Sequence, residues 1–275
     1  MWSVTHRNLQ NWLNVYGDVI TNIKWLKARN MKLLQKIDNI GEYDVKDEVW
    51  KIYRIMYKNN LIKGGNLFTE NDIIKNDGRP YIKCQFIHNG KCTEEMRFSG
   101  ETDFNFSAKK KRELCRSRYE HYKRILERDL VGEGVLEIYL EMLKECSKKH
   151  HSQDNISIML QSGNMQGAKG AIGLDRLDVW LLILDMKYRY NINMLQNHCT
   201  MENCSKIEKF LNLFDDVYDY ANTIYHINRK LVDKLIESGK RPLDSAENII
   251  KYMSLAKEFW NQKHTFIEKQ LKYEQ

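Results

Sequence analysis

Proline scarcity most constrains how this sequence can fold, because its 275 residues include only two prolines, Pro80 and Pro242. Proline disrupts helix interiors, since its ring clashes with the preceding turn and its nitrogen has no hydrogen to donate. Apolar residues make up 42% of the chain and charged residues 29%, as in ordered globular proteins. We therefore predict a mainly α-helical, multi-helix globular protein.

Apolar residues recur at helical spacing along most of the chain. In the first such segment, Leu9, Trp12, Leu13 and Tyr16 follow the three- and four-residue spacing of an amphipathic helix. The predicted helices cover residues 6–37, 45–60, 108–130, 134–148, 174–190, 204–238 and 244–272, and 204–238 is interpreted as one helix or two. The short apolar run 156–160 fits a strand or a helix equally well.

Residues 80–99 depart from the helical pattern. Two short apolar-rich runs, 81–87 and 92–98, flank Asn89-Gly90. Asn-Gly favours a two-residue type I′ turn, because both central residues of that turn need a positive φ. We predict one small β-hairpin here.

These signals divide the chain into three predicted segments. They are an N-terminal helical lobe over residues 1–75, a β-hairpin segment over 76–106 and a C-terminal helical lobe over 107–275. A chain of 275 residues is long enough for two lobes that share a core.

The sequence indicates neither secretion nor membrane insertion. The longest apolar run, residues 179–184, has six residues, whereas a spanning helix needs about 20. The first 15 residues lack the apolar core of a signal peptide. The six cysteines lack the tight spacing of a zinc knuckle and are interpreted as reduced thiols. We expect a cytoplasmic or nuclear protein that is not secreted and holds no metal or cofactor.

The net charge of +7 is concentrated in part of the chain. Residues 107–131 contain nine Lys and Arg against four Asp and Glu, whereas residues 132–275 contain 19 against 20. On a helix, an arc of about 60° would hold Lys109, Arg112, Arg116 and Lys123. Such a row suits the phosphates of a nucleic-acid backbone. The alternative is a solvated helix face with internal acid–base pairs.

A glycine-rich loop over residues 162–173 precedes the predicted helix 174–190. Backbone N–H groups at a helix N-terminus attract anions, and Lys169 and Arg176 would add positive charge. The spacing matches neither G-x-x-x-x-G-K-[ST] nor G-x-G-x-x-G. Three interpretations stay open: a connector between packed helices, a loop that orders on a nucleic acid or partner, or a nucleotide cradle.

Two short motifs resemble those of known enzyme families. Asp215, Asp216 and Asp219 form a DDxxD pattern, which resembles the magnesium- and diphosphate-binding motif of class I terpene synthases. The second motif of that family, N-D-x-x-S-x-x-x-E, does not occur in the 56 residues that follow. Arg116 and His121 have the R-x4-H spacing and resemble HEPN-type ribonucleases, in which Arg and His from paired helices act on the scissile phosphate and 2′-hydroxyl.

The sequence leaves three hypotheses about function. The first is a non-enzymatic nucleic-acid-binding protein, such as a viral or phage nucleoprotein, with RNA favoured because no DNA-reading motif is visible. The second is a self-associating structural protein, such as a coat, matrix or scaffold subunit, and the third is a HEPN-like ribonuclease. The predicted nucleic-acid-binding residues are Lys109, Lys110, Lys111, Arg112, Arg116, Lys123, Arg124, Lys169 and Arg176.

Overall fold

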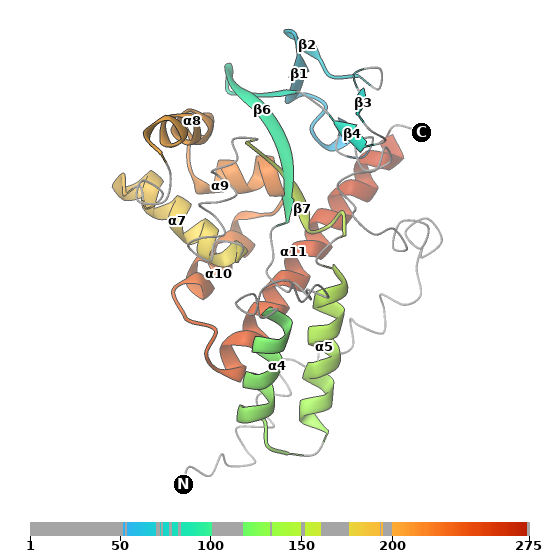
Figure 1. The fold of residues 1–275 in the computed structure, drawn as a ribbon, viewed down its shortest axis with the longest axis vertical. Coiled ribbons are helices and arrows are strands. Elements are labelled where there is room, and N and C mark those ends of the chain that lie inside the picture. Colours follow the sequence, from blue (N-terminus) through green and yellow to red (C-terminus); the bar gives the residue numbers. More distant parts are fainter. Residues whose placement is uncertain are drawn as a thin grey trace. The chain divides into compact units, whose positions relative to one another are not determined.

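The described part of the chain is mostly helical, as the proline-poor sequence predicts (Figure 1). The computed structural model describes residues 52, 54–69, 72, 74–76, 79–81, 84–100, 118–132, 134–149, 152–160, 176–192, 194 and 200–273. All of them belong to one compact unit, which spans Glu42–Gln275. Within these ranges, every helix is too short or too polar to cross a bilayer.

The helices follow the predicted periodicity closely except in one region. They are α4 (Arg118–Asp129), α5 (Val135–Lys149), α7 (Leu177–Tyr190), α8 (Met201–Leu211), α9 (Val217–Tyr220), the π-helix η4 (Ala221–Tyr225), α10 (Arg229–Gly239) and α11 (Ala246–Tyr273). The predicted helix 6–37 lies outside the described residues. The predicted segment 204–238 is neither one helix nor two, because it is divided among α8, α9, η4 and α10.

Local capping explains that division. Asp216 accepts hydrogen bonds from the backbone N–H groups of Tyr218 and Asp219 and so begins α9. Asn228 accepts one from Leu231 and begins α10. Between them, His226 takes the left-handed conformation (φ 56°, ψ 37°) that ends η4. Side chains that satisfy free N–H groups can start a new helix within a run whose apolar spacing is helical throughout.

One antiparallel sheet runs through the described residues, in the order β2-β1-β5-β6-β7. Its strands are β1 (Leu61–Lys63), β2 (Asn66–Leu67), β5 (Gln85–His88), β6 (Lys91–Gly100) and β7 (Ile156–Leu160), and a separate pair is formed by β3 (Ile74–Asn76) and β4 (Arg79–Tyr81). Asn89 and Gly90 connect β5 to β6 with φ values of 48° and 71°.

The sheet is larger than the single hairpin that we predicted. β1 adds to one side of the β5–β6 pair, and β7, a buried strand in all five residues, adds to the other. The β6–β7 register joins Met96 to Leu160 and Gly100 to Ile156. The strands come from all three predicted segments, because β1 lies within 1–75, β5 and β6 within 76–106 and β7 within 107–275. Pairing between such distant strands leaves no local signal in the sequence.

The helical core has two packing zones. α4 and α5 pack against each other and against α11 (Figure 1). α7 packs tightly on α10, where a Cβ atom at Gly239 would lie 2.4 Å from the carbonyl oxygen of Asp178. Only glycine permits that approach. An aromatic cluster of edge-on rings contacts Trp180 of α7 through Tyr220, and it is formed by Phe210, Phe214, Tyr220, Tyr225 and Phe259.

Candidate functional site

Helix α4, the described part of the basic segment 107–131, has an apolar side and a charged side; we call it the basic helix. Tyr122, Ile125 and Leu126 are buried, while Arg124 and Arg128 are exposed. This arrangement lets α4 dock on the core and present cations to solvent. The predicted cations that lie outside the described residues are Lys109, Lys110, Lys111, Arg112 and Arg116.

The described cations of α4 are partly engaged. Lys123 pairs with Glu127 at 3.2 Å, one helical turn away, with both side chains well exposed. Such surface pairs contribute little energy and open readily. Arg124 donates from Nε to the backbone oxygen of Glu120 at 3.1 Å, which leaves its Nη groups facing solvent. Arg124 forms no ion pair within the described ranges, so it is the better placed of the two for a phosphate.

The last turn of α4 is fixed to the start of α11. Arg128 binds the carboxylate of Asp129 through Nε at 2.6 Å and the backbone oxygen of Asp244 through Nη2 at 2.7 Å. Asp129 in turn accepts a hydrogen bond from the backbone N–H of Ala246 at 2.8 Å. This end of the basic helix is therefore anchored, and Arg128 is already occupied.

Arg176 neutralises a buried carboxylate. Its Nε and Nη2 atoms lie 3.0 and 2.7 Å from the two oxygens of Asp178, which is fully buried, and Ser238 donates to the same carboxylate at 2.9 Å. The guanidinium also lies 5.4 Å from the ring centre of Tyr252. A phosphate at Arg176 would have to compete with Asp178. Lys169, the other predicted cation of this region, lies outside the described residues.

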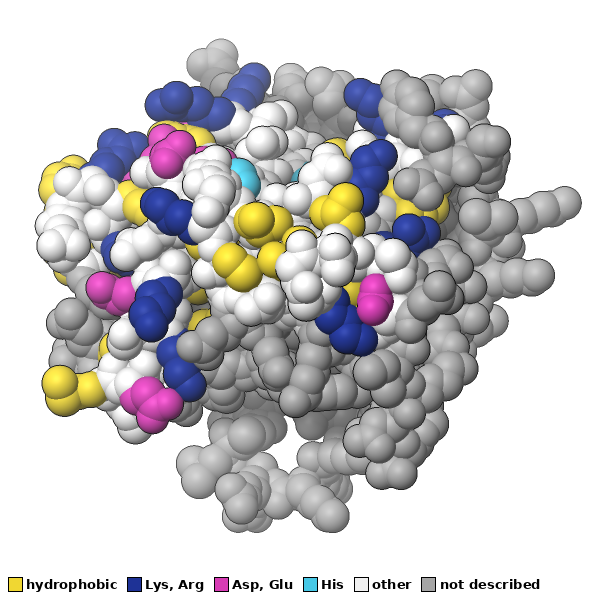
Figure 2. Space-filling model, turned by 90° about the horizontal axis from the view of Figure 1, so that it is seen from above, with side chains coloured by type: hydrophobic (Ala, Val, Ile, Leu, Met, Phe, Trp, Pro, Cys, Tyr) yellow, Lys and Arg dark blue, Asp and Glu magenta, His cyan; other side chains and the backbone are white. Residues whose placement is uncertain are grey.

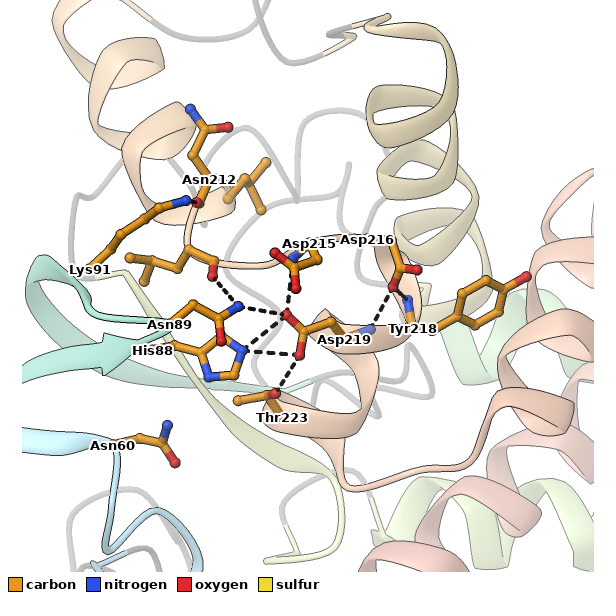
Figure 3. A network of polar contacts seen from close by, with 12 residues as sticks. Asn60, His88, Asn89, Lys91, Asn212, Asp215, Asp216, Tyr218, Asp219 and Thr223 are labelled. Carbon is orange, nitrogen blue, oxygen red and sulfur yellow. Dashed lines mark hydrogen bonds and ion pairs between the residues drawn. The ribbon is translucent and has the colours of Figure 1, made fainter.

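The DDxxD segment forms a brace between the β5–β6 turn and the loop that follows α8 (Figure 3). The two carboxylate oxygens of Asp219 both lie 3.0 Å from Nε2 of His88. The same carboxylate accepts hydrogen bonds from Asn89 Nδ2, from Thr223 Oγ1 and from the backbone N–H of Asp215. We call these five residues, with Asp219 at their centre, the Asp219 brace.

The brace is not arranged as a metal site. Asp216 turns toward the first turn of α9, where its Oδ1 accepts from Tyr218 and Asp219, while Asp219 faces His88 (Figure 3). No group of three or more His, Cys, Asp or Glu side chains in the described ranges is placed to hold a metal ion. The geometry of the DDxxD segment therefore departs from the terpene synthase motif that its sequence resembles.

The other predicted site features are only partly visible. His121 is exposed on α4, whereas Arg116 of the R-x4-H motif and the glycine-rich loop 162–173 lie outside the described residues. Cys84, Cys92 and Cys146 form no disulfide bond, whereas Cys204 is disulfide-bonded. The expectation that all six cysteines are reduced thiols is therefore wrong for Cys204.

Sequence reasoning missed a hollow of about 450 Å³ between η4 and α11. Its lining includes Asn222, His226, Asn261, Gln262, Phe266 and Lys269. In the sequence these residues look like an ordinary polar helix surface, because residues from two segments almost 40 positions apart have to meet before the hollow exists. The left-handed His226 has no sequence signal of its own.

Figure 2 shows the face of the described part that carries β1, β2 and α8. Lys and Arg side chains are spread over this face with acidic side chains between them, and hydrophobic side chains gather near its middle. Charge on this face is therefore mixed, unlike the concentrated excess of residues 107–131.

Comparison with protein families, with curated proteins and with solved structures finds no match to the chain.

Proposed function

We propose that the protein binds nucleic acid, RNA in preference to DNA, and does so as a non-enzymatic protein of the cytoplasm or nucleus. The observation that carries the proposal is the charge excess of residues 107–131, nine cations against four acids. Part of that segment is α4, whose apolar side is buried and whose other side carries exposed Arg124. A helix held in this way can follow a phosphate backbone without losing its packing.

The contacts of α4 suggest how its cations divide their roles. Arg128 holds the helix against the start of α11 through Asp129 and Asp244. Lys123 and Arg124 are available at the surface, and the run Lys109–Arg112 precedes them in the sequence with no acidic residue. We propose that phosphates contact these residues first. Arg176 and Lys169 contribute less, because Arg176 already neutralises Asp178.

An assembly protein is the second candidate, supported by exposed apolar side chains. Val131 and Met201 are each 92% exposed, Tyr190 is 67% exposed and Ile138 is 50% exposed. Exposed apolar side chains become buried where protein surfaces pair. In a coat, matrix or scaffold subunit these residues would pair copies of the chain, and the two candidates are compatible in a nucleoprotein that assembles on its nucleic acid.

Charge reversal tests the first candidate. The variant Arg112→Glu/Arg116→Glu/Lys123→Glu is measured with labelled single-stranded RNA and duplex DNA between 50 and 200 mM salt. We expect wild-type affinity to fall steeply with salt and the variant to bind RNA at least about tenfold more weakly, with a salt slope smaller by about two, because each lost phosphate contact removes roughly 0.7 from the slope.

The matched control is Lys58→Glu/Lys148→Glu/Lys209→Glu, which changes the net charge equally through three exposed lysines elsewhere. Equal weakening in both variants would show that only overall charge matters and would remove the role of residues 107–131. Absence of wild-type binding at low salt would reject the proposal. Concentration-dependent light scattering without nucleic acid would then favour the assembly protein.

A further inference from the structure

The hollow between η4 and α11 is lined by one continuous helix face and by the end of the π-helix. Asn261, Gln262, Phe266 and Lys269 are spaced as neighbours on one side of α11. Asn222 and His226 face them from η4 and the residue that ends it.

The backbone beside the hollow is unusual. A π-helix such as η4 contains an extra residue per turn and occurs often at functional sites. It is followed directly by His226 in a left-handed conformation (φ 56°), which costs free energy for any residue other than glycine. This conformation is kept although the sequence offers no glycine here, and it brings the His226 ring against α11.

His226 has an unfilled hydrogen-bonding position. Its ring stacks on Phe266, with centroids 3.8 Å apart and planes inclined by 8°, and lies 5.1 Å from the ring of Tyr57. Its Nε2 atom is buried and has no hydrogen-bond partner in the part of the chain that the structure describes. Burial lowers the pKa of His226 to about 3, so the ring is neutral near pH 7 and the buried nitrogen carries no charge. Buried polar atoms without partners are rare and call for an explanation.

Other polar side chains around the hollow also have donors or acceptors without a partner among the described residues. The side chains of Asn222 and Asn261 and the ammonium of Lys269 make no hydrogen bond or ion pair within the described ranges. Gln262 uses its Oε1 to accept from the backbone N–H of Asn228 at 2.9 Å, which leaves its Nε2 to donate. The hollow thus offers amide donors and acceptors, an aromatic ring and the ammonium of Lys269, while the carboxylate of Glu258 in its lining is paired with Lys234 at 2.8 Å.

We propose that this hollow is a nucleobase pocket for single-stranded nucleic acid, an inference that rests on the proposed function. The partly exposed ring of Phe266, backed by His226, is the platform on which a base stacks. The amides of Asn222 and Asn261 offer donor and acceptor atoms to the base edge, as amides do in base recognition. Lys269 neutralises the adjoining phosphate. A duplex cannot enter, because its bases are stacked and paired.

The pocket and the basic helix can be occupied by one strand. The last turn of α4 contacts α11 at Ala246, and the pocket begins at Asn261. Fifteen residue steps along α11 separate them, or about 22 Å at 1.5 Å per step. A short oligonucleotide therefore reaches only one of the two sites, whereas a longer strand reaches both. Affinity should rise with strand length by more than the added phosphate contacts account for.

The test compares two labelled probes with the same phosphates: a 12-nucleotide single-stranded oligouridine and a 12-nucleotide strand without bases. We expect the wild-type protein to bind the strand with bases about 5- to 150-fold more tightly, which corresponds to the stacking of one base. The double variant Asn222→Ala/Asn261→Ala keeps the stacking platform but loses the contacts to the base edge, so it should show a smaller preference and bind the abasic strand as wild type does. The control Asn59→Ala removes an exposed amide elsewhere and should keep the preference.

A second variant tests the platform. Phe266→Leu keeps an apolar side chain against His226 but removes the aromatic face, and it should also reduce the preference for bases. Equal wild-type binding of the two probes, or an unchanged preference in the amide double variant, would overturn the pocket while leaving phosphate binding intact. Failure of the wild-type protein to bind either probe would instead overturn the proposed function itself.

Discussion

Helix α11 carries two polar regions whose hydrogen bonding differs. On one side, Trp260, Lys263 and His264 reach a buried turn at Asp154–Ser157, and the polar groups that meet there are paired. We call this the buried junction. On another side, facing the nucleobase pocket, the side chains of Asn261 and Lys269 have no hydrogen-bond or ion-pair partner within the described ranges. A paired polar group contributes to the fold, whereas an unpaired one at an open hollow keeps its capacity for a ligand.

The buried junction is dense in charge. Lys263 is completely buried and donates to the backbone oxygen of Ile156 at 2.6 Å and to Ser157 Oγ at 2.5 Å. Asp154 lies 2.9 Å from Lys149 Nζ and 3.1 Å from His264 Nδ1. These contacts hold β7 and the turn before it against α11, so the junction positions the sheet on the helices.

Removal of Asp154 should have the largest effect on stability. Asp154 has a side chain only 3% exposed, and Asp154→Ala leaves Lys149 and His264 without their shared carboxylate. We expect the free energy of unfolding to fall by about 3 kcal/mol, the lower end for a broken buried pair, because Lys149 is partly exposed. Urea unfolding measures this loss.

The control for that variant lies on the other side of the same helix. Asn261→Ala removes an exposed amide of the pocket and should change the free energy of unfolding by less than about 0.5 kcal/mol. Similar losses in both variants would break the comparison between a structural face and a ligand-binding face.

The two regions should respond oppositely to pH through their histidines. The hydrogen bond to Asp154 raises the pKa of His264 above its ordinary 6.5, so the contribution of His264 is complete below pH 6.5 and is lost as pH rises through the raised pKa. Burial lowers the pKa of His226 to about 3, so the unfolded chain binds more protons between pH 3 and 6.5 and stability falls as pH falls through that range.

Asp154 also contributes to the loss of stability at acid pH. Burial alone would raise its pKa, but His264 and Lys149 together bring it below 3.8, and its contribution is lost below that pH. We therefore expect maximal stability near pH 6.5. Urea midpoints from pH 4 to 9 should show that His264→Gln flattens the alkaline limb and that His226→Gln flattens the acid limb. The reverse assignment would contradict the His264–Asp154 contact and the burial of His226.

Local sequence signals predicted much of this fold. α4, α5, α7 and α11 follow apolar spacing within single segments, and the positive φ values of Asn89 and Gly90 follow from the residues themselves. The larger sheet did not follow, because β7 joins β6 across more than 50 residues of chain. The caps at Asp216 and Asn228 divide a segment whose periodicity indicates longer helices.

The candidate sites were predictable only in part. The charge excess of residues 107–131 is a property of the sequence, whereas the neutralisation of Arg176 by Asp178 depends on side-chain geometry. The pocket was invisible, since Asn222 and Asn261 differ from other surface amides only in what they face. Unpaired polar groups are identified only after every hydrogen bond around them is known.

The Asp219 brace is an intermediate case, paired as fully as the buried junction but partly exposed, with 24% of the Asp219 side chain accessible. Asp219→Ala removes the carboxylate that holds His88, Asn89 and Thr223, and we expect a loss of about 1 kcal/mol in the free energy of unfolding. Asp215→Ala is the control from the same motif and should cost less than about 0.5 kcal/mol, because the side chain of Asp215 is exposed.

Unfolding with and without magnesium decides between a brace and a metal motif. A brace gives the same two losses in both conditions, whereas magnesium that stabilised the wild-type protein but neither variant would restore the metal-binding interpretation of DDxxD.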